Sequence, residues 1–406
     1  MARNSGAKSS EFYRAAPLPN LGQMSARRLA PFGVTVFTEM TALANQLGAV
    51  NLGQGFPDWD GPDFAKQAAV DSLQAGGTDQ YPPSAGIPTL REAIARRYSP
   101  LLGRELDPDT EITVTGGCTE ALAASFLGLI DPEDKVVLIE PYFDSYPVGV
   151  ALAGARPRFL TLRPPDFALD LDALERLVTP ATRVLVVNTP HNPTGRVFSR
   201  DEMAAIARLC VENDVLAISD EVYEEIYFEG EHLHLATLPG MAERTVTLSS
   251  VGKTYSLTGW KVGWAIAPPE LTHGIRSAHQ YLTFTTPTPV QHGAVGALGA
   301  PADYYSELRT SYLKRRDLLV EGLVGAGFEV RPPQGTYFVM ADYRELADLD
   351  DRAFALQLIH EAGVAAVPPS AFYHDPGSAQ RLLRFAFCKE PAVLEEAVER
   401  LQRYLT

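Results

Sequence analysis

The chain has 406 residues, of which 46% are hydrophobic and 21% charged, which is enough to bury a full core and to form two domains. Its net charge of −15 argues against a nucleic-acid partner, because contact with a phosphate backbone requires a basic face. No apolar run approaches the ~20 residues of a membrane span, so we expect no membrane association. The cysteines Cys118, Cys210 and Cys388 are scattered, which is typical of the reducing cytoplasm.

Residues 1–20 are polar and lack an apolar signal core, and we expect a loose tail there. From residue 34 onward, helical patterns and short β-branched runs follow one another. Val34–Leu47 and Ala302–Ala326 are predicted helices on either side of a central region. After Phe328 we expect strand, helix, strand and a last helix over Ala392–Tyr404.

The central region has the pattern of strands that are buried on both faces. It predicts a mostly parallel sheet with helices on both sides. The predicted strands are Ile112–Thr115, Val136–Ile139, Val184–Val187, Val215–Ser219, Val246–Leu248 and Val262–Ile266, and the predicted helices are Thr119–Leu129 and Asp201–Asn213. We therefore predict a large α/β domain over residues 49–290 and a small α+β domain made of 21–48 and 291–406.

Lys253 stands in a short turn after an apolar strand, in the sequence Ser250-Val-Gly-Lys253, and a second cation, Lys261, follows. The segment does not match a P-loop, because Thr247 stands where that motif needs glycine. It also lacks the companion tripeptides of penicillin-binding enzymes. Two interpretations remain: an exposed lysine in a turn, or an amine that forms a Schiff base with pyridoxal phosphate, whose phosphate Lys261 would contact.

A candidate phosphate site lies where a strand ends at Gly116-Gly117 and a helix begins near Cys118. Helix N-termini expose free N–H groups and a partial positive charge, which suits a phosphate. Gly117 lets the backbone approach closely. The alternative is an ordinary strand-to-helix turn.

The loop from Asn188 to Gly195 follows another predicted strand and is made rigid by two prolines. Ligands of open parallel sheets bind at this edge. Asn192 would offer its amide to a ring hydroxyl or a substrate carboxylate, unless it only completes a β-turn. We expect a structural role for His191.

Asp220 and Tyr223 follow the next strand, in Ser219-Asp-Glu-Val-Tyr223. A carboxylate that leaves an apolar strand is buried and needs a cationic partner, and a protonated pyridine nitrogen is one. Tyr223 could bond to the phenolate oxygen of the same ring. The alternative for Asp220 is a helix N-cap.

Arg384 and Phe143 have further candidate roles, and one pair of histidines needs an interpretation. Arg384 lies within an apolar strand, where its planar fork suits an α-carboxylate, unless it faces solvent at an edge. Phe143 could stack on a flat ring or pack in the core. The pair His232-x-His234 has no third ligand nearby that we can identify, and we predict no metal site.

Taken together and in order, these segments resemble the class I/II pyridoxal-phosphate-dependent aminotransferases of fold type I. The resemblance extends to Gly53-Gln-Gly-Phe-Pro57, Gln80-Tyr81-Pro-Pro and Gly335-Thr-Tyr-Phe338. Within that family the chain is most similar to the kynurenine/methionine-type branch, and in particular to bacterial N-succinyldiaminopimelate aminotransferases.

The resemblance implies a role for each candidate residue. Lys253 would hold the cofactor and move the substrate proton, Asp220 would hold the pyridine nitrogen, and Phe143 would stack on the ring. Tyr223 and Asn192 would face the ring hydroxyl. Gly117, Cys118, Ser250 and Lys261 would hold the phosphate, and Arg384, Gly53 and Asn192 would receive the substrate carboxylate. Tyr81 would reach the phosphate of a partner subunit, which implies a homodimer with shared active sites.

The implied activity is transfer of an amino group from an L-amino acid to a 2-oxo acid such as 2-oxoglutarate, in ping-pong order. N-succinyl-L,L-diaminopimelate, kynurenine, methionine and glutamine are candidate donors. The stretch 279–289 lacks the arginine of aspartate-specific members, which favours a neutral, aromatic or extended side chain. A cysteine-conjugate β-lyase uses nearly the same residues and stays open as an alternative. A non-catalytic regulator is the remote third possibility.

Overall fold

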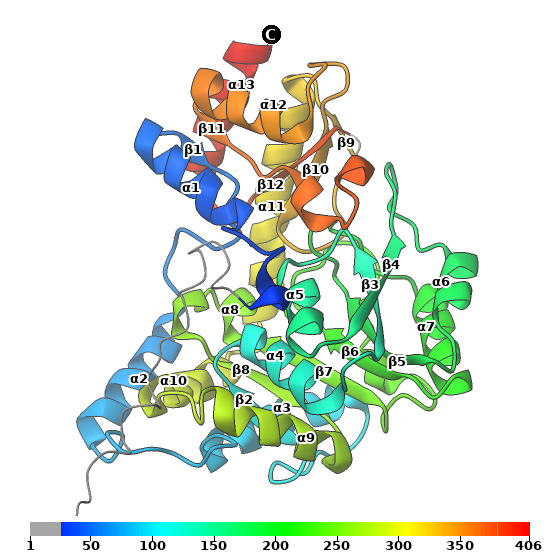
Figure 1. Cartoon of the computed structure of the whole chain (residues 1–406). Coiled ribbons are helices and arrows are strands. Elements are labelled where there is room, and N and C mark those ends of the chain that lie inside the picture. Colours follow the sequence, from blue (N-terminus) through cyan, green and yellow to red (C-terminus); the bar gives the residue numbers. More distant parts are fainter. Residues whose placement is uncertain (1–25, 380) are drawn as a thin grey trace, which may run out of the picture.

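The computed structural model describes residues 26–379 and 381–406, so that the predicted tail at 1–20 lies outside the described residues. Its centre is a seven-stranded sheet in the order β2-β8-β7-β6-β5-β3-β4 (Figure 1). The strands are β2 (Ile112–Thr115), β3 (Lys135–Glu140), β4 (Arg156–Thr161), β5 (Thr182–Asn188), β6 (Leu216–Asp220), β7 (Thr245–Ser250) and β8 (Gly263–Ile266). Strand β8 runs antiparallel to both β2 and β7, and the other neighbouring pairs of this sheet are parallel. The mostly parallel sheet is therefore confirmed.

Helices cover both faces of this sheet, as the pattern of doubly buried strands predicts. Successive residues of β5 point to opposite faces. Val186 packs in a cluster with residues of α4, α5 and α9, whereas Leu185 and Val187 pack in another with residues of α6 and α7. The helices are α4 (Cys118–Leu129), α5 (Ser145–Leu152), α6 (Leu171–Leu177), α7 (Arg200–Glu212), α8 (Val251–Thr254) and α9 (Pro269–Leu282).

A further group of helices packs beside β2 and β8. It consists of α2 (Asp63–Ala75), α3 (Pro88–Leu102) and α10 (Thr288–Leu298). Ala294 and Ala297 of α10 share a core cluster with Ala65 and Leu90. No helix within the described residues combines the length and the apolar character that crossing a membrane requires.

The remaining elements form a second layer at the top of Figure 1, built from both ends of the described chain. They comprise α1 (Val36–Leu47), β1 (Val50–Asn51), α11 (Tyr304–Gly325), β9 (Glu329–Val330), β10 (Phe338–Asp342), α12 (Asp351–Gln357), β11 (Val364–Ala365), β12 (Leu382–Ala386) and α13 (Pro391–Leu405). Strands β12, β10 and β9 form an antiparallel sheet, and β1 pairs with β11. One core cluster contains Met40 of α1, Leu319 of α11 and Phe385 of β12. The domain limits at residues 48 and 290 stay a prediction.

The ends of three neighbouring strands define the place where ligands are expected. Asn188 is the last residue of β5 and pairs in register with Asp220, the last residue of β6. Strand β7 runs parallel to β6 and ends at Ser250, directly before α8. Because parallel strands end at the same edge, their terminal side chains gather there.

Candidate active site

One cavity at this edge brings together most of the predicted site residues, which come from β6, α8, the start of α4 and the loops beside them. The predicted residues that line it are Gly117, Cys118, Phe143, Asn192, Asp220, Tyr223, Ser250, Lys253 and Lys261. Three predicted residues, Gly53, Arg384 and Tyr81, do not line it.

The short turn that we expected at Lys253 is the single turn of helix α8. Its Nζ donates a hydrogen bond to the hydroxyl of Tyr337 at 2.8 Å and lies 3.4 Å from the carbonyl oxygen of Gly55. Burial lowers the pKa of the amine to about 8, because removal from water disfavours the charged form. The interpretation as an exposed lysine is therefore wrong.

Asp220 is 4% exposed, and its partners are neutral groups. Its Oδ2 accepts a hydrogen bond from the hydroxyl of Tyr146 at 2.8 Å, and its Oδ1 accepts one from the backbone N–H of Val222 and a weak one from the thiol of Cys118. Burial raises the pKa of this carboxyl. A turn follows it, so the interpretation as a helix N-cap is wrong.

The start of α4 and the segment before β8 form one wall of the cavity. Gly117 precedes the helix with φ 79°, and a Cβ atom built on it would lie 3.2 Å from Nζ of Lys261. Glycine thus lets a cation approach the N–H groups at the helix start. Ser250 also lines the cavity, and its hydroxyl accepts a hydrogen bond from the N–H of Gly252. This combination of a helix start, an ammonium group and a hydroxyl has the chemistry that suits a phosphate.

Aromatic side chains shape the rest of the cavity. Tyr223 is 2% exposed, and its ring packs edge-on against Tyr337 at 5.2 Å between centroids. Burial raises the pKa of the Tyr223 phenol. Phe143 packs edge-on against Tyr146 at 5.8 Å and presents part of its surface to the cavity.

Arg384 is 1% exposed within β12, so the interpretation as a solvent-facing arginine is wrong. Its guanidinium donates hydrogen bonds to Oδ1 of Asn192 at 3.2 Å and to the carbonyl oxygen of Gly53 at 3.0 Å. Its Nε has no partner among the described residues. Burial lowers the pKa of the guanidinium to about 10. A buried cation with an unused donor is suited to an anion.

The other predicted residues lie outside the cavity. His191 is buried and shares a hydrogen bond of 2.7 Å with Thr194, which agrees with a structural role. Tyr81 is 84% exposed, and its ring packs edge-on against that of Phe284. Tyr81 therefore does not contribute to the cavity of its own chain.

Two tyrosines that were not predicted as site residues contact its central groups: Tyr146 bonds to Asp220, and Tyr337 bonds to Lys253. Tyr146 lies three residues after Phe143, and Tyr337 lies within the segment Gly335-Thr-Tyr-Phe338 of the family resemblance. Each contact joins residues far apart in the chain, and no local pattern reveals it.

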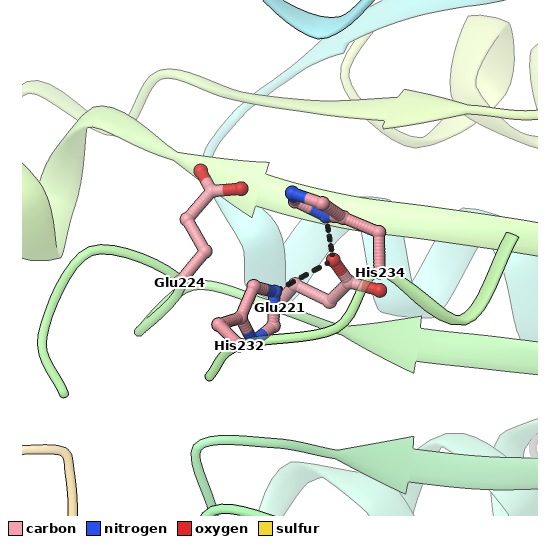
Figure 2. A group of neighbouring side chains, drawn as sticks. All are labelled: Glu221, Glu224, His232 and His234. Atoms are coloured by element: carbon pink, nitrogen blue, oxygen red, sulfur yellow. Dashed lines mark hydrogen bonds and ion pairs between the residues drawn. The ribbon is translucent and has the colours of Figure 1, made fainter. Parts of the chain in front are cut away.

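The expectation that His232 and His234 have no third potential ligand nearby is wrong. Glu221 and Glu224 lie beside the two histidines (Figure 2). Potential ligand atoms of the four residues lie within 4.8 Å of one another.

Comparison with known proteins agrees with this geometry. The family model "Aminotransferase class I and II" matches residues 48–401. The probable N-succinyldiaminopimelate aminotransferase of Mycobacterium tuberculosis is 49% identical, over 93% of this chain and 98% of the relative. Methionine aminotransferase of Escherichia coli is 41% identical, over 93% of this chain and 97% of the relative.

Solved structures show the same likeness. The structure of the M. tuberculosis N-succinyldiaminopimelate aminotransferase superposes with a TM-score of 0.90 at 48% identity, covering 94% of this chain and 100% of that one. The structure of Thermus thermophilus aspartate aminotransferase superposes with a TM-score of 0.87 at 34% identity, covering 94% of this chain and 99% of that one. The chain thus belongs to the class I and II aminotransferases and has the fold type I architecture.

Proposed function

We propose that this aminotransferase works with pyridoxal 5′-phosphate held in the cavity between Lys253 and Asp220. The observation that carries the proposal is that a buried amine of lowered pKa and a buried carboxylate with only neutral partners line one cavity. The cradle of Gly117, Lys261 and Ser250 fits the phosphate. When bound, the cofactor carries the amino group between substrates and withdraws electrons from the carbon that loses its proton.

The side chains supply binding, orientation and proton transfer. Asp220 would neutralise the protonated ring nitrogen, held in place by Tyr146. Tyr223 and Asn192 would face the ring hydroxyl, Phe143 would stack on the ring, and Cys118 would contribute to the phosphate cradle. Because the pKa of Lys253 is lowered to about 8, an appreciable fraction of its amine is neutral near physiological pH and can accept the α-proton at Nζ.

Arg384 would bind the α-carboxylate of the substrate, together with Asn192 and Gly53. The rings of Phe37, Phe372 and Phe338 surround its guanidinium at 4.9, 5.1 and 4.0 Å. These apolar surfaces favour a substrate with a neutral, aromatic or extended side chain. The relatives' names suggest N-succinyl-L,L-diaminopimelate, methionine or kynurenine as donor and 2-oxoglutarate as acceptor.

We further propose a cytoplasmic homodimer in which Tyr81 contacts the phosphate in the partner's site. Tyr81 and Phe284 are both exposed and pack against each other, and a patch of exposed aromatic surface supports an interface there.

A substrate panel tests the proposed function. Holoenzyme is assayed with twenty L-amino acids, kynurenine and N-succinyl-L,L-diaminopimelate, each with 2-oxoglutarate. We expect glutamate to form with one or more of the neutral or extended donors, and no glutamate with any donor would overturn the proposal. A cysteine conjugate without any 2-oxo acid measures the β-lyase alternative, since only elimination yields pyruvate there.

A further inference from the structure

A second polar cluster lies beside the turn that follows Asp220. It consists of Glu221, Glu224, His232 and His234. The side chains of Glu221, His232 and His234 are only 0%, 4% and 9% exposed. The turn after β6 supplies the two glutamates, and the segment before Leu235 supplies the two histidines (Figure 2).

Glu221 is the centre of this cluster. Its Oε2 lies 3.1 Å from Nε2 of His232 and forms a short hydrogen bond with Nδ1 of His234. Its Oε1 accepts hydrogen bonds from the hydroxyl of Ser219 and the N–H of Leu235, which fix the carboxylate. In metal sites, such supporting hydrogen bonds orient the ligating carboxylate.

Two polar atoms of the cluster are buried without a hydrogen-bond partner among the described residues. They are Oε2 of Glu224 and Nδ1 of His232. The other oxygen of Glu224 accepts from Ser249 at 3.0 Å and from Tyr98, so the carboxyl group is held in position. Figure 2 shows it pointing toward the ring of His234. A buried polar atom without a partner is costly, and a cation bound by Oε2 of Glu224 would remove this cost for that oxygen.

We propose that the four side chains bind one divalent transition-metal cation, Zn²⁺ or Mn²⁺. Two carboxylates balance the charge of a divalent ion. Two imidazoles favour a transition metal over Mg²⁺ or Ca²⁺, which prefer all-oxygen sites. Ligand atoms within 4.8 Å of one another can all reach a central ion at ordinary bond lengths of about 2.0–2.2 Å after small side-chain rotations.

The site is connected to the active centre through the backbone. Glu221 directly follows Asp220, and Glu224 directly follows Tyr223. A cation that holds both glutamates fixes the turn from which Asp220 and Tyr223 face the cavity. The cation acts as a structural clamp and does not contact the substrate.

Metal uptake by the untagged holoenzyme tests the proposal without an activity assay. The protein is treated with a chelator and dialysed against Zn²⁺ or Mn²⁺, and bound metal is counted by elemental analysis. Co²⁺ serves as a spectroscopic probe, because its visible bands report imidazole and carboxylate ligation. The variants are His232→Gln and Glu224→Gln, and the matched control is His360→Gln, which changes an exposed histidine of the second layer.

We expect one cation per chain in the wild type and the control, and affinity at least about 100-fold weaker in the two cluster variants, as removal of a ligand requires. Added Zn²⁺ or Mn²⁺ should raise the melting temperature of the wild type and the control only. Equal uptake by all four proteins, or no uptake by the wild type, would overturn the proposal. Metal uptake by the wild type tests the proposal even where a variant does not fold. In Glu224→Gln the amide oxygen can still accept the hydrogen bonds from Tyr98 and Ser249.

Discussion

The amine of Lys253 donates a 2.8 Å hydrogen bond to the hydroxyl of Tyr337, which donates in turn to the carbonyl oxygen of Gly55 at 2.6 Å. The lone pairs of the tyrosine oxygen therefore face the amine and stabilise its charged form. Burial acts in the opposite direction and prevails, since the pKa of Lys253 lies at about 8.

This balance predicts the pH dependence of the apoenzyme amine. Lysine reacts only as the neutral form, whose population rises with pH, and a lowered pKa moves that rise to lower pH. The rate of attachment of pyridoxal phosphate should reach half its maximum near pH 8, where an ordinary lysine is neutral in only ~0.4% of molecules. Tyr337→Phe removes the acceptor and should lower the midpoint by about one further pH unit. Tyr373→Phe is the control, because that buried hydroxyl has no partner among the described residues. An unchanged midpoint in Tyr337→Phe would refute the role of this contact.

Substitutions around Asp220 should lower the rate in a fixed order. Asp220→Asn removes the charge that would stabilise the protonated ring and should slow the half-reaction by at least about 100-fold, or ~3 kcal/mol. Tyr146→Phe removes one hydrogen bond to that carboxylate and should cost about tenfold. Single-turnover rates with saturating amino acid measure both. A larger loss in Tyr146→Phe than in Asp220→Asn would contradict the assignment.

Replacement of Arg384 by lysine should weaken recognition of the carboxylate selectively. The ammonium group of lysine cannot reproduce the planar fork, so kcat/KM for amino acids should fall by about 100-fold. The same half-reaction with an amine that lacks the carboxylate should change little. Equal losses for both substrates would show that Arg384 does not bind the carboxylate.

Mixed dimers test the shared active site. Lys253→Ala and Tyr81→Ala proteins, each inactive or nearly so, are unfolded together and refolded. About one quarter of the wild-type activity should return, because half of the dimers are mixed and each mixed dimer has one intact site. Recovery of no activity, with dimers shown by sedimentation, would mean that Tyr81 does not act across the interface.

Local patterns in the sequence were sufficient to predict the strands that position the site. Strand β2 has the predicted limits, and β5 and β6 differ from theirs by one or two residues, because their β-branched runs are buried on both faces. Strand β4 was not predicted, since it begins with the exposed residues Arg156, Pro157 and Arg158, whose charges and proline are typical of an edge strand.

Local patterns could not predict contacts between residues that are far apart in the sequence. Tyr146 and Asp220 are 74 positions apart, and Lys253 and Tyr337 are 84 apart. The cluster around Glu221 was missed for a related reason. The residues next to His232 and His234 in the sequence do not provide the third potential ligand. Glu221 provides it from 11 and 13 positions away.

The central claim is that Lys253 is the amine that holds the cofactor. Holoenzyme reduced with borohydride, digested and analysed by mass spectrometry tests this claim directly. The account predicts a single peptide that carries the reduced cofactor on Lys253, and no such peptide from Lys253→Ala, which should still bind pyridoxal phosphate noncovalently. Cofactor on a different lysine of the wild type, or on none, would contradict the account.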